Sequence, residues 1–77
     1  MKIKLENFAK KYGLVFMYYK DYPTGYEDMS VHYKSYILNI NNIDYTKFSI
    51  FNGEYSKYYL DLKSAFKAFE KIMGELK

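Results

Sequence analysis

The sequence predicts one small α+β domain, in which an antiparallel sheet of three to four strands is packed on one face by an N-terminal and a C-terminal helix. Apolar residues recur at helical spacing at both ends of the chain, and they alternate with polar residues between those ends. The chain has 77 residues, which leaves room for one core and makes residues 1–77 a single domain. The predicted order of elements is therefore α-β-β-β(-β)-α.

Both helices are predicted from continuous apolar stripes. In the first helix, over residues 3–12, the stripe lies at i, i+3, i+4 and i+7: Leu5, Phe8, Ala9 and Tyr12. Gly13 follows where a C-cap glycine belongs. Asp61 is the expected N-cap of the last helix. Its stripe is longer: Leu62, Ala65, Phe66, Phe69, Ile72, Met73 and Leu76.

The first strands are predicted from residue type and alternation. Residues 14–20 are rich in β-formers, and residues 21–25 form a turn in which Pro23 fixes φ and Gly25 permits a positive φ. From Met29 the pattern alternates, with Met29, Val31 and Tyr33 on one face and Ser30, His32 and Lys34 on the other. Near Ser35 the apolar phase shifts, which indicates either a bulge or a break.

A hairpin is predicted in the second half of the sheet. Asn41 and Asn42 can turn the chain, and residues 43–51 form a strand in which Phe48 and Ile50 share a face. Asn52-Gly53 is the pair that type I′ turns favour, because both positions tolerate a positive φ. The returning strand runs to about Leu60.

Composition indicates a cytoplasmic protein. The chain has no cysteine, its N-terminus is charged where a signal peptide would be apolar, and its apolar runs are too short to span a bilayer. The net charge is +3, and all twelve basic residues are lysine. Many Lys, Asn, Ile, Tyr and Phe without any Arg indicate an AT-rich gene, as in a low-GC bacterium, its phages or its plasmids.

We expect no enzyme, no cofactor and no metal site. Thiol chemistry is excluded by the absence of cysteine, and His32 is the only histidine. It lies in the middle of a strand, where we interpret it as a solvent-facing residue. The adjacent acids Glu27 and Asp28 would point to opposite faces of a strand, and no glycine-rich phosphate loop is present.

Lysines recur on both helices. Lys63, Lys67 and Lys71 repeat every four residues on the outer side of the last helix, and Lys10 and Lys11 lie on the first. Such a row could follow the phosphates of a nucleic acid. It could equally be the solvated face of an amphipathic helix, in which Glu70 and Glu75 interrupt the lysines.

The order of helix, three or four strands and helix resembles the double-stranded RNA-binding domain. Residues 5–14 (LENFAKKYGL) are similar to the first helix of that family, and Lys63 and Lys67 would correspond to its phosphate-binding lysines. The resemblance implies binding of duplex RNA. Where the family has a Gly-Pro-x-His loop, residues 24–27 (TGYE) stand here.

Tyrosine is the other candidate interaction residue, with eleven in the chain. Because alternation sends neighbours to opposite faces, Tyr18-Tyr19 and Tyr58-Tyr59 must each place one ring on each face of the sheet. Tyr22 and Tyr26 flank Pro23 and Gly25 and are expected to be exposed in a loop. Tyrosine is frequent in binding hot spots, so we select four candidates for partner binding: Tyr18, Tyr22, Tyr26 and Tyr58. The alternative is that codon bias supplied tyrosine wherever β-propensity was needed.

From the sequence we therefore expect a non-enzymatic interaction protein of a low-GC bacterium, its phage or another mobile element. It would bind and inhibit a larger host protein, such as a defence nuclease. The alternative is a small nucleic-acid-binding module that uses the basic face of the last helix. A homodimer is compatible with either function.

Overall fold

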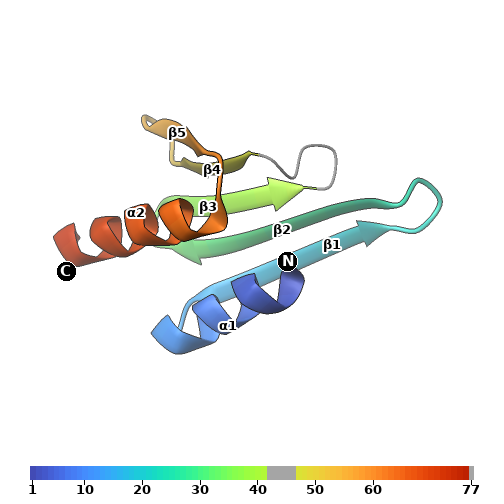
Figure 1. Ribbon diagram of the computed structural model, residues 1–77, viewed down its shortest axis with the longest axis horizontal. Helices are drawn as coiled ribbons and strands as arrows, with labels where there is room; N and C mark the ends of the chain where they lie inside the picture. The colour runs from blue at the N-terminus through green and yellow to red at the C-terminus, as the bar shows by residue number, and fades with distance from the viewer. Residues whose placement is uncertain (42–46, 77) are drawn as a thin grey trace.

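The structure, a computed structural model that describes residues 1–41 and 47–76, is an α+β domain with a five-stranded antiparallel sheet (Figure 1). The predicted fold class is confirmed. Along the chain the elements are α1 (Lys2–Tyr12), β1 (Val15–Asp21), β2 (Tyr26–Tyr33), β3 (Tyr36–Asn41), β4 (Phe48–Phe51), β5 (Ser56–Tyr59) and α2 (Leu62–Glu75). No helix among the described residues is long and apolar enough to cross a membrane.

The five strands form a meander in which each strand pairs with the next, in the order β1-β2-β3-β4-β5. The β1–β2 hairpin is the longest, and its register runs without interruption from Val15↔His32 to Asp21↔Tyr26. The distal end of this hairpin extends beyond both helices (Figure 1). Its loop reverses with Gly25 at a φ of 75°, as Gly25 was predicted to allow.

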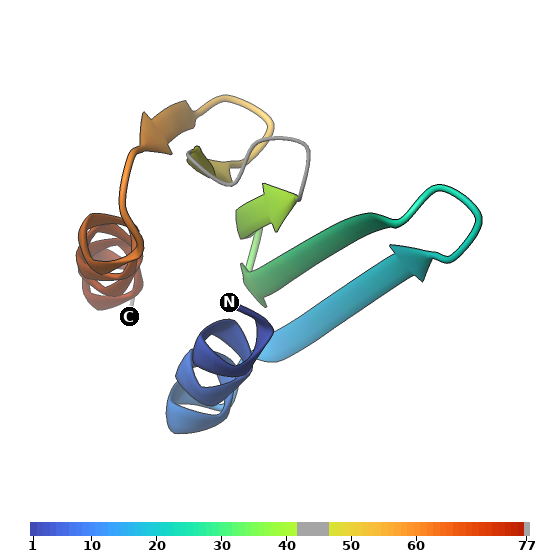
Figure 2. The same cartoon turned by 45° about the vertical axis from the view of Figure 1, so that its right-hand side comes forward.

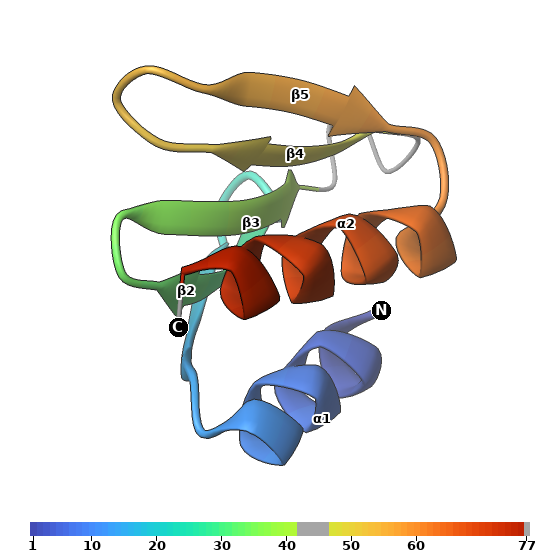
Figure 3. The same ribbon diagram turned by 90° about the vertical axis from the view of Figure 1, so that its left-hand side faces the viewer.

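Both helices pack against the same face of the sheet, as predicted (Figures 2 and 3). Where α1 and α2 meet, the rings of Phe8 and Phe66 stack with their centroids 4.1 Å apart. The core beneath them is formed by apolar residues from α1, α2 and the three central strands: Leu5, Phe8, Ala9, Met29, Val31, Leu38, Ile40, Phe48, Ile50, Ala65, Phe69 and Met73. Sheet and helices therefore share a single core.

The sheet has one strand more than predicted, because the phase shift near Ser35 is a complete turn. Lys34 has a φ of 53°, and Tyr33 pairs directly with Tyr36, so that β2 and β3 form a tight hairpin. A positive φ is uncommon for lysine. The turn could not be identified from the sequence because it has neither Gly nor Asn at this position. The alternative of a break is confirmed, and that of a bulge is wrong.

The hairpin between β4 and β5 is also confirmed, but its type I′ turn is wrong. Phe51 pairs with Ser56, which leaves a four-residue loop, and neither Asn52 nor Gly53 has a positive φ. The Asn52 side chain organises this loop instead, since its Oδ1 accepts hydrogen bonds from the backbone N–H groups of Glu54 (2.9 Å) and Tyr55 (2.7 Å). Of the predicted strand 43–51, residues 43–46 lie outside the described residues, as does Asn42.

The two helix termini are formed as predicted. Gly13 ends α1 in the left-handed conformation, with a φ of 67°. Asp61 caps α2: its Oδ1 accepts from the backbone N–H of Ser64 at 2.8 Å, and its Oδ2 accepts from the Ser64 hydroxyl at 3.0 Å. These hydrogen bonds, the backbone one first, lower the pKa of Asp61 from its ordinary value of 3.8.

The cap of α2 makes a pH-dependent contribution to stability. Because the pKa of Asp61 is lower in the folded chain than in the unfolded chain, its contribution is complete above about pH 4 and is lost as the pH falls through the folded pKa. Asp61→Asn keeps a capping oxygen but does not titrate. We expect the difference in thermal midpoint between wild type and Asp61→Asn to shift against the wild type as the pH is lowered from neutrality to about pH 2. A difference that is constant with pH would contradict this role.

Candidate partner-binding surface

The face of the sheet opposite the helices is a continuous surface to which all five strands contribute. Within the described residues no helix lies on this face (Figures 2 and 3). Because paired residues share a face and successive residues alternate, the register defines its members, which we call the open face: Val15, Met17, Tyr19, Asp21, Tyr26, Asp28, Ser30, His32, Ile37, Asn39, Asn41, Ser49, Phe51, Ser56 and Tyr58.

Three apolar side chains and one histidine form a row across this surface. Val15 pairs with His32, His32 with Ile37, and Ile37 with Phe51, so that four strands contribute to one band. Val15 is 61% exposed at its β1 end, while Ile37 and Phe51 are half-buried by their neighbours. The next row begins with Met17, which is 56% exposed, and ends with Tyr58, which is 64% exposed. Large apolar side chains therefore lie at both edges of the open face, and half-buried Ile37 and Phe51 lie at one end of the strands between them.

The middle of the open face is polar but internally bonded. The Ser30 hydroxyl is 2.8 Å from Nε2 of His32, and Ser30 is only 8% exposed. The Asn39 amide donates to the Asp28 carboxylate at 2.8 Å and to the Met29 carbonyl at 3.0 Å. These contacts satisfy polar groups that a partner would otherwise have to satisfy on binding. His32 lies on the face away from the helices, as predicted, and it is half-buried and hydrogen-bonded there.

Charge is divided unequally between the two sides of the sheet. None of the residues that the five described strands contribute to the open face is a lysine, although the chain has twelve basic residues, all of them lysine. The charged residues there are Asp21 and Asp28. The strand lysines Lys20 and Lys57 pair with residues of the helix face, Glu27 and Ile50. The strand residues of the open face are therefore apolar or weakly acidic, and the nearest described cation is Lys47, just before β4, whose Nζ lies 5.9 Å from the Tyr58 ring centroid.

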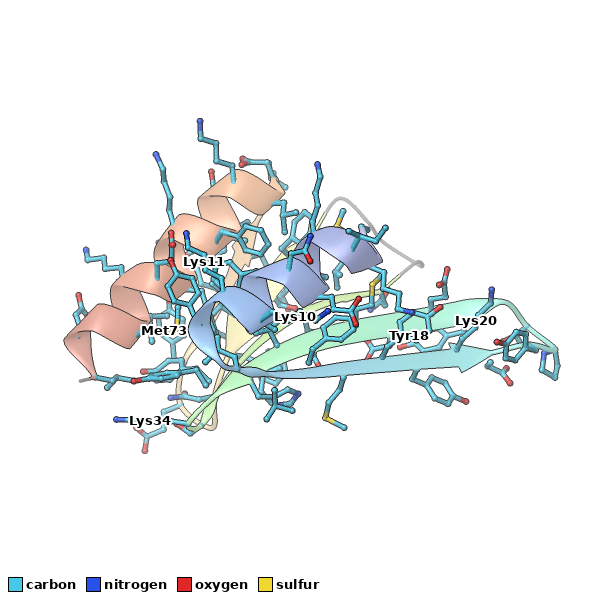
Figure 4. All side chains as sticks on the ribbon, turned by 90° about the horizontal axis from the view of Figure 1, so that it is seen from below. Lys10, Lys11, Tyr18, Lys20, Lys34 and Met73 are labelled. Carbon is cyan, nitrogen blue, oxygen red and sulfur yellow. The ribbon has the colours of Figure 1, made fainter. Side chains whose placement is uncertain are left out.

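The four candidate tyrosines do not form one surface. Tyr58 lies on the open face, whereas Tyr18 lies on the helix face, where its hydroxyl donates to Glu27 and Lys2 Nζ lies 4.4 Å from its ring centroid (Figure 4). Tyr22 is 81% exposed at the tip of the β1–β2 hairpin. The prediction that each Tyr-Tyr pair divides between the faces is confirmed.

The prediction that Tyr26 is an exposed loop residue is wrong. Tyr26 is the first residue of β2 and pairs with Asp21, so it is half-buried on the open face. Its ring centroid lies 6.1 Å from that of Tyr19. Tyr19 was not among the candidates, although alternation with Tyr18 indicated that one of these two rings would face away from the helices. The alternation of side chains along β1 was the sequence signal that could have identified Tyr19.

The candidate lysines are exposed on the helices. Lys63, Lys67 and Lys71 lie along α2 with the spacing predicted from the sequence. Lys10 and Lys11 leave α1 in different directions, because successive helical residues are about 100° apart (Figure 4). Glu70 accepts a hydrogen bond from the Tyr12 hydroxyl, so this acid links α2 to α1. The lysine row and the open face therefore belong to different sides of the molecule.

A groove of about 400 Å³ lies between α2 and the β3–β5 end of the helix face. Three tyrosines and two lysines contribute to its lining: Tyr36, Tyr55, Tyr59, Lys57 and Lys71. The rings of Tyr36 and Tyr55 meet edge to face, with centroids 5.9 Å apart. Hydrogen bonding to Tyr59, followed by burial, raises the pKa of Tyr55. The last lysine of the α2 row therefore borders an aromatic groove.

Neither metal nor triad geometry is found in the part of the chain that the structure describes. No group of three His, Cys, Asp or Glu residues there could hold a metal ion. Ser30 and His32 are hydrogen-bonded, but Asp28 is four residues from His32 along β2, a separation of about 13 Å at strand rise. A carboxylate at that distance cannot orient the imidazole as a triad requires. We interpret Ser30 and His32 as a polar link on the sheet.

The comparisons with known proteins give no relative for this chain: no protein-family model matches it, nor does any curated protein or solved structure.

The Ser30–His32 link is testable by a double-mutant cycle. His32→Val removes the partner of a nearly buried hydroxyl, so we expect a loss of about 1–3 kcal/mol in unfolding free energy. Ser30→Ala in the same background removes the unsatisfied hydroxyl and should recover most of that loss. Urea denaturation followed by circular dichroism measures both changes. If the two losses simply add, the hydrogen bond does not stabilise the sheet.

Proposed function

We propose that this protein is a non-enzymatic binding protein that engages a protein partner through its open face. The observation that carries the proposal is the composition of that face: exposed Val15, Met17, Tyr19 and Tyr58 with no strand lysine. An apolar patch of this kind on a small domain favours a protein interface. The two exposed tyrosines supply the residue type that is enriched in hot spots.

The expected partner surface is apolar opposite the exposed residues of β1 and β5 and basic opposite the two carboxylates of the open face. The charged strand residues of the open face are Asp21 and Asp28, so a partner with Lys or Arg at the matching positions gains electrostatic complementarity. A nucleic-acid backbone would meet carboxylates on this face without any strand lysine. The same charge pattern therefore supports a protein partner and disfavours a phosphate backbone.

The setting of this function follows from composition. We propose that the protein acts in the cytoplasm of a low-GC bacterium and is encoded by that bacterium, a phage or another mobile element, because the chain lacks cysteine and arginine. Small size without recognisable catalytic residues fits an inhibitor that blocks a larger host protein, such as a defence nuclease. The inhibitory role remains a prediction.

Site-directed photocrosslinking tests the proposal in cells that naturally produce the protein. A photoreactive phenylalanine analogue replaces Tyr58 on the open face, or Lys67 on the outer side of α2. We expect position 58 to capture one protein reproducibly and position 67 not to capture it. Binding of the purified captured protein should weaken about 30-fold in Tyr58→Glu, the effect of a hot-spot residue worth about 2 kcal/mol.

Ile3→Glu is the matched control, because Ile3 is 71% exposed on α1 and is not part of the open face. It should leave the affinity unchanged. Equal capture from positions 58 and 67, or equal weakening by Tyr58→Glu and Ile3→Glu, would contradict binding through the open face.

The second candidate function is nucleic-acid binding by α2. The observation that favours it is that Lys71, the end of the lysine row, borders the groove lined by Tyr36, Tyr55 and Tyr59. Lysines that follow a backbone beside aromatic rings that can stack on bases are typical of single-strand binding. The resemblance to the double-stranded RNA-binding domain would instead assign Lys63 and Lys67 to duplex RNA.

Charge reversal distinguishes the two functions. Under the leading proposal, Lys63→Glu, Lys67→Glu and Lys71→Glu together leave binding to the captured protein unchanged. A control carries the same charge change elsewhere, at Lys4, Lys20 and Lys34. Fluorescence anisotropy with labelled single-stranded DNA, duplex DNA and duplex RNA should show only binding that disappears at physiological salt. Salt-resistant binding that the α2 variant alone abolishes would establish the second function instead.

A further inference from the structure

We propose that β1 is a dimerisation edge, at which two copies of this chain pair antiparallel and join their sheets into one of ten strands. β1 is an end strand: within the described sheet it pairs with β2 on one side and with no strand on the other (Figure 2). The backbone N–H and C=O groups on that side of an end strand have no ladder partner within the sheet.

The composition of β1 is unusual for an exposed edge. Its seven residues, VFMYYKD, include neither proline nor glycine, and β1 pairs with β2 over its full length without a bulge. Five of the seven are exposed, among them Val15, Met17 and Tyr19. Soluble proteins usually protect such edges with short strands, prolines, bulges or inward charges. The other edge of this sheet follows that practice, since β5 has four residues.

A second copy of β1 complements this edge better than a parallel partner would. In an antiparallel pair about a two-fold axis, the charged ends at Lys20 and Asp21 lie at opposite ends of the interface. Two like-charged lysines are thereby kept apart. Residues with the same parity face each other across the axis, so the open faces of the two copies lie on the same side of the joined sheet.

One register pairs all seven residues, namely that with the axis at Tyr18, the central residue of β1. In this register Met17 faces Tyr19 of the second copy, Val15 faces Asp21, and symmetry repeats both contacts. Methionine sulfur and an aromatic ring make a favourable pair. Tyr18 remains on the helix face, where it already contacts Glu27 and Lys2. The dimer would join two open faces into one surface, but it does not depend on the proposed protein partner.

The interface is small, since it consists of two seven-residue strands and one apolar cluster. Interfaces of this size are weak. We therefore expect a reversible dimer with a micromolar dissociation constant, populated at concentrations above that value.

Sedimentation velocity over a concentration series tests the proposal on the full chain. Met17→Lys and Tyr19→Glu should each raise the dimer dissociation constant about tenfold, because symmetry applies every cross-strand change twice. The combined variant Met17→Lys/Tyr19→Glu should recover wild-type dimerisation, since Lys and Glu then face each other across the axis. Circular dichroism checks that the variants fold, as expected for side chains that are more than half exposed.

Tyr58→Lys is the matched control, because it places the same charge on the open face but at the opposite edge. It should leave dimerisation unchanged. Three results would overturn the proposal: a wild-type chain that stays monomeric to millimolar concentration, a dimer that survives both single variants, or a dimer that Tyr58→Lys weakens as much as Met17→Lys does. Failure of the double variant to recover dimerisation would overturn the register with its axis at Tyr18.

Discussion

Burial of the row Val31, Leu38 and Ile50 beneath two helices is the constraint on which the rest of the structure depends. These residues pair across β2, β3 and β4 and are completely buried. A shift of one residue in any of these strands would move its apolar side chains to the opposite face. Packing against the helices therefore selects the strand register, and the register determines which side chains lie on the open face.

The same constraint explains why one face stays open. A chain of 77 residues can form one core, and both helices are needed to cover it. Nothing in the described chain remains to cover the second face, which nevertheless carries Val15, Met17 and Tyr58 in exposed positions. Most described lysines lie on the helices and their side of the sheet, with Lys47 beside Tyr58 as an exception. A small fold has thus separated an apolar, weakly acidic surface from a basic one, and both proposed interactions follow from that separation.

Strong local signals predicted most of the fold. The apolar stripes located both helices to within a residue or two, and Asp61 and Gly13 marked their caps. The number of strands was underestimated because the turn at Lys34 carries no sequence signal. The positive φ of Lys34 is imposed by the strand pairing on both sides of the turn and not by residue type. At Asn52-Gly53 a side-chain hydrogen bond replaced the backbone turn that the pair favours. The site was less predictable: assigning Tyr18, Tyr19 and Tyr26 to a face requires knowing which strands pair and in what register.

Methionine oxidation tests the central claim, that one face of the sheet is covered and the other is open. Met17 is 56% exposed on the open face, whereas Met29 and Met73 lie in the core beneath the helices. The folded protein is treated with dilute hydrogen peroxide at a sub-micromolar protein concentration, where the proposed dimer would dissociate, and each sulfoxide is followed by peptide mass spectrometry. Met17 should oxidise nearly as fast as a methionine in the unfolded chain, while Met29 and Met73 stay protected. Protection of Met17 equal to that of Met29 would mean that the face is covered, and would contradict the account.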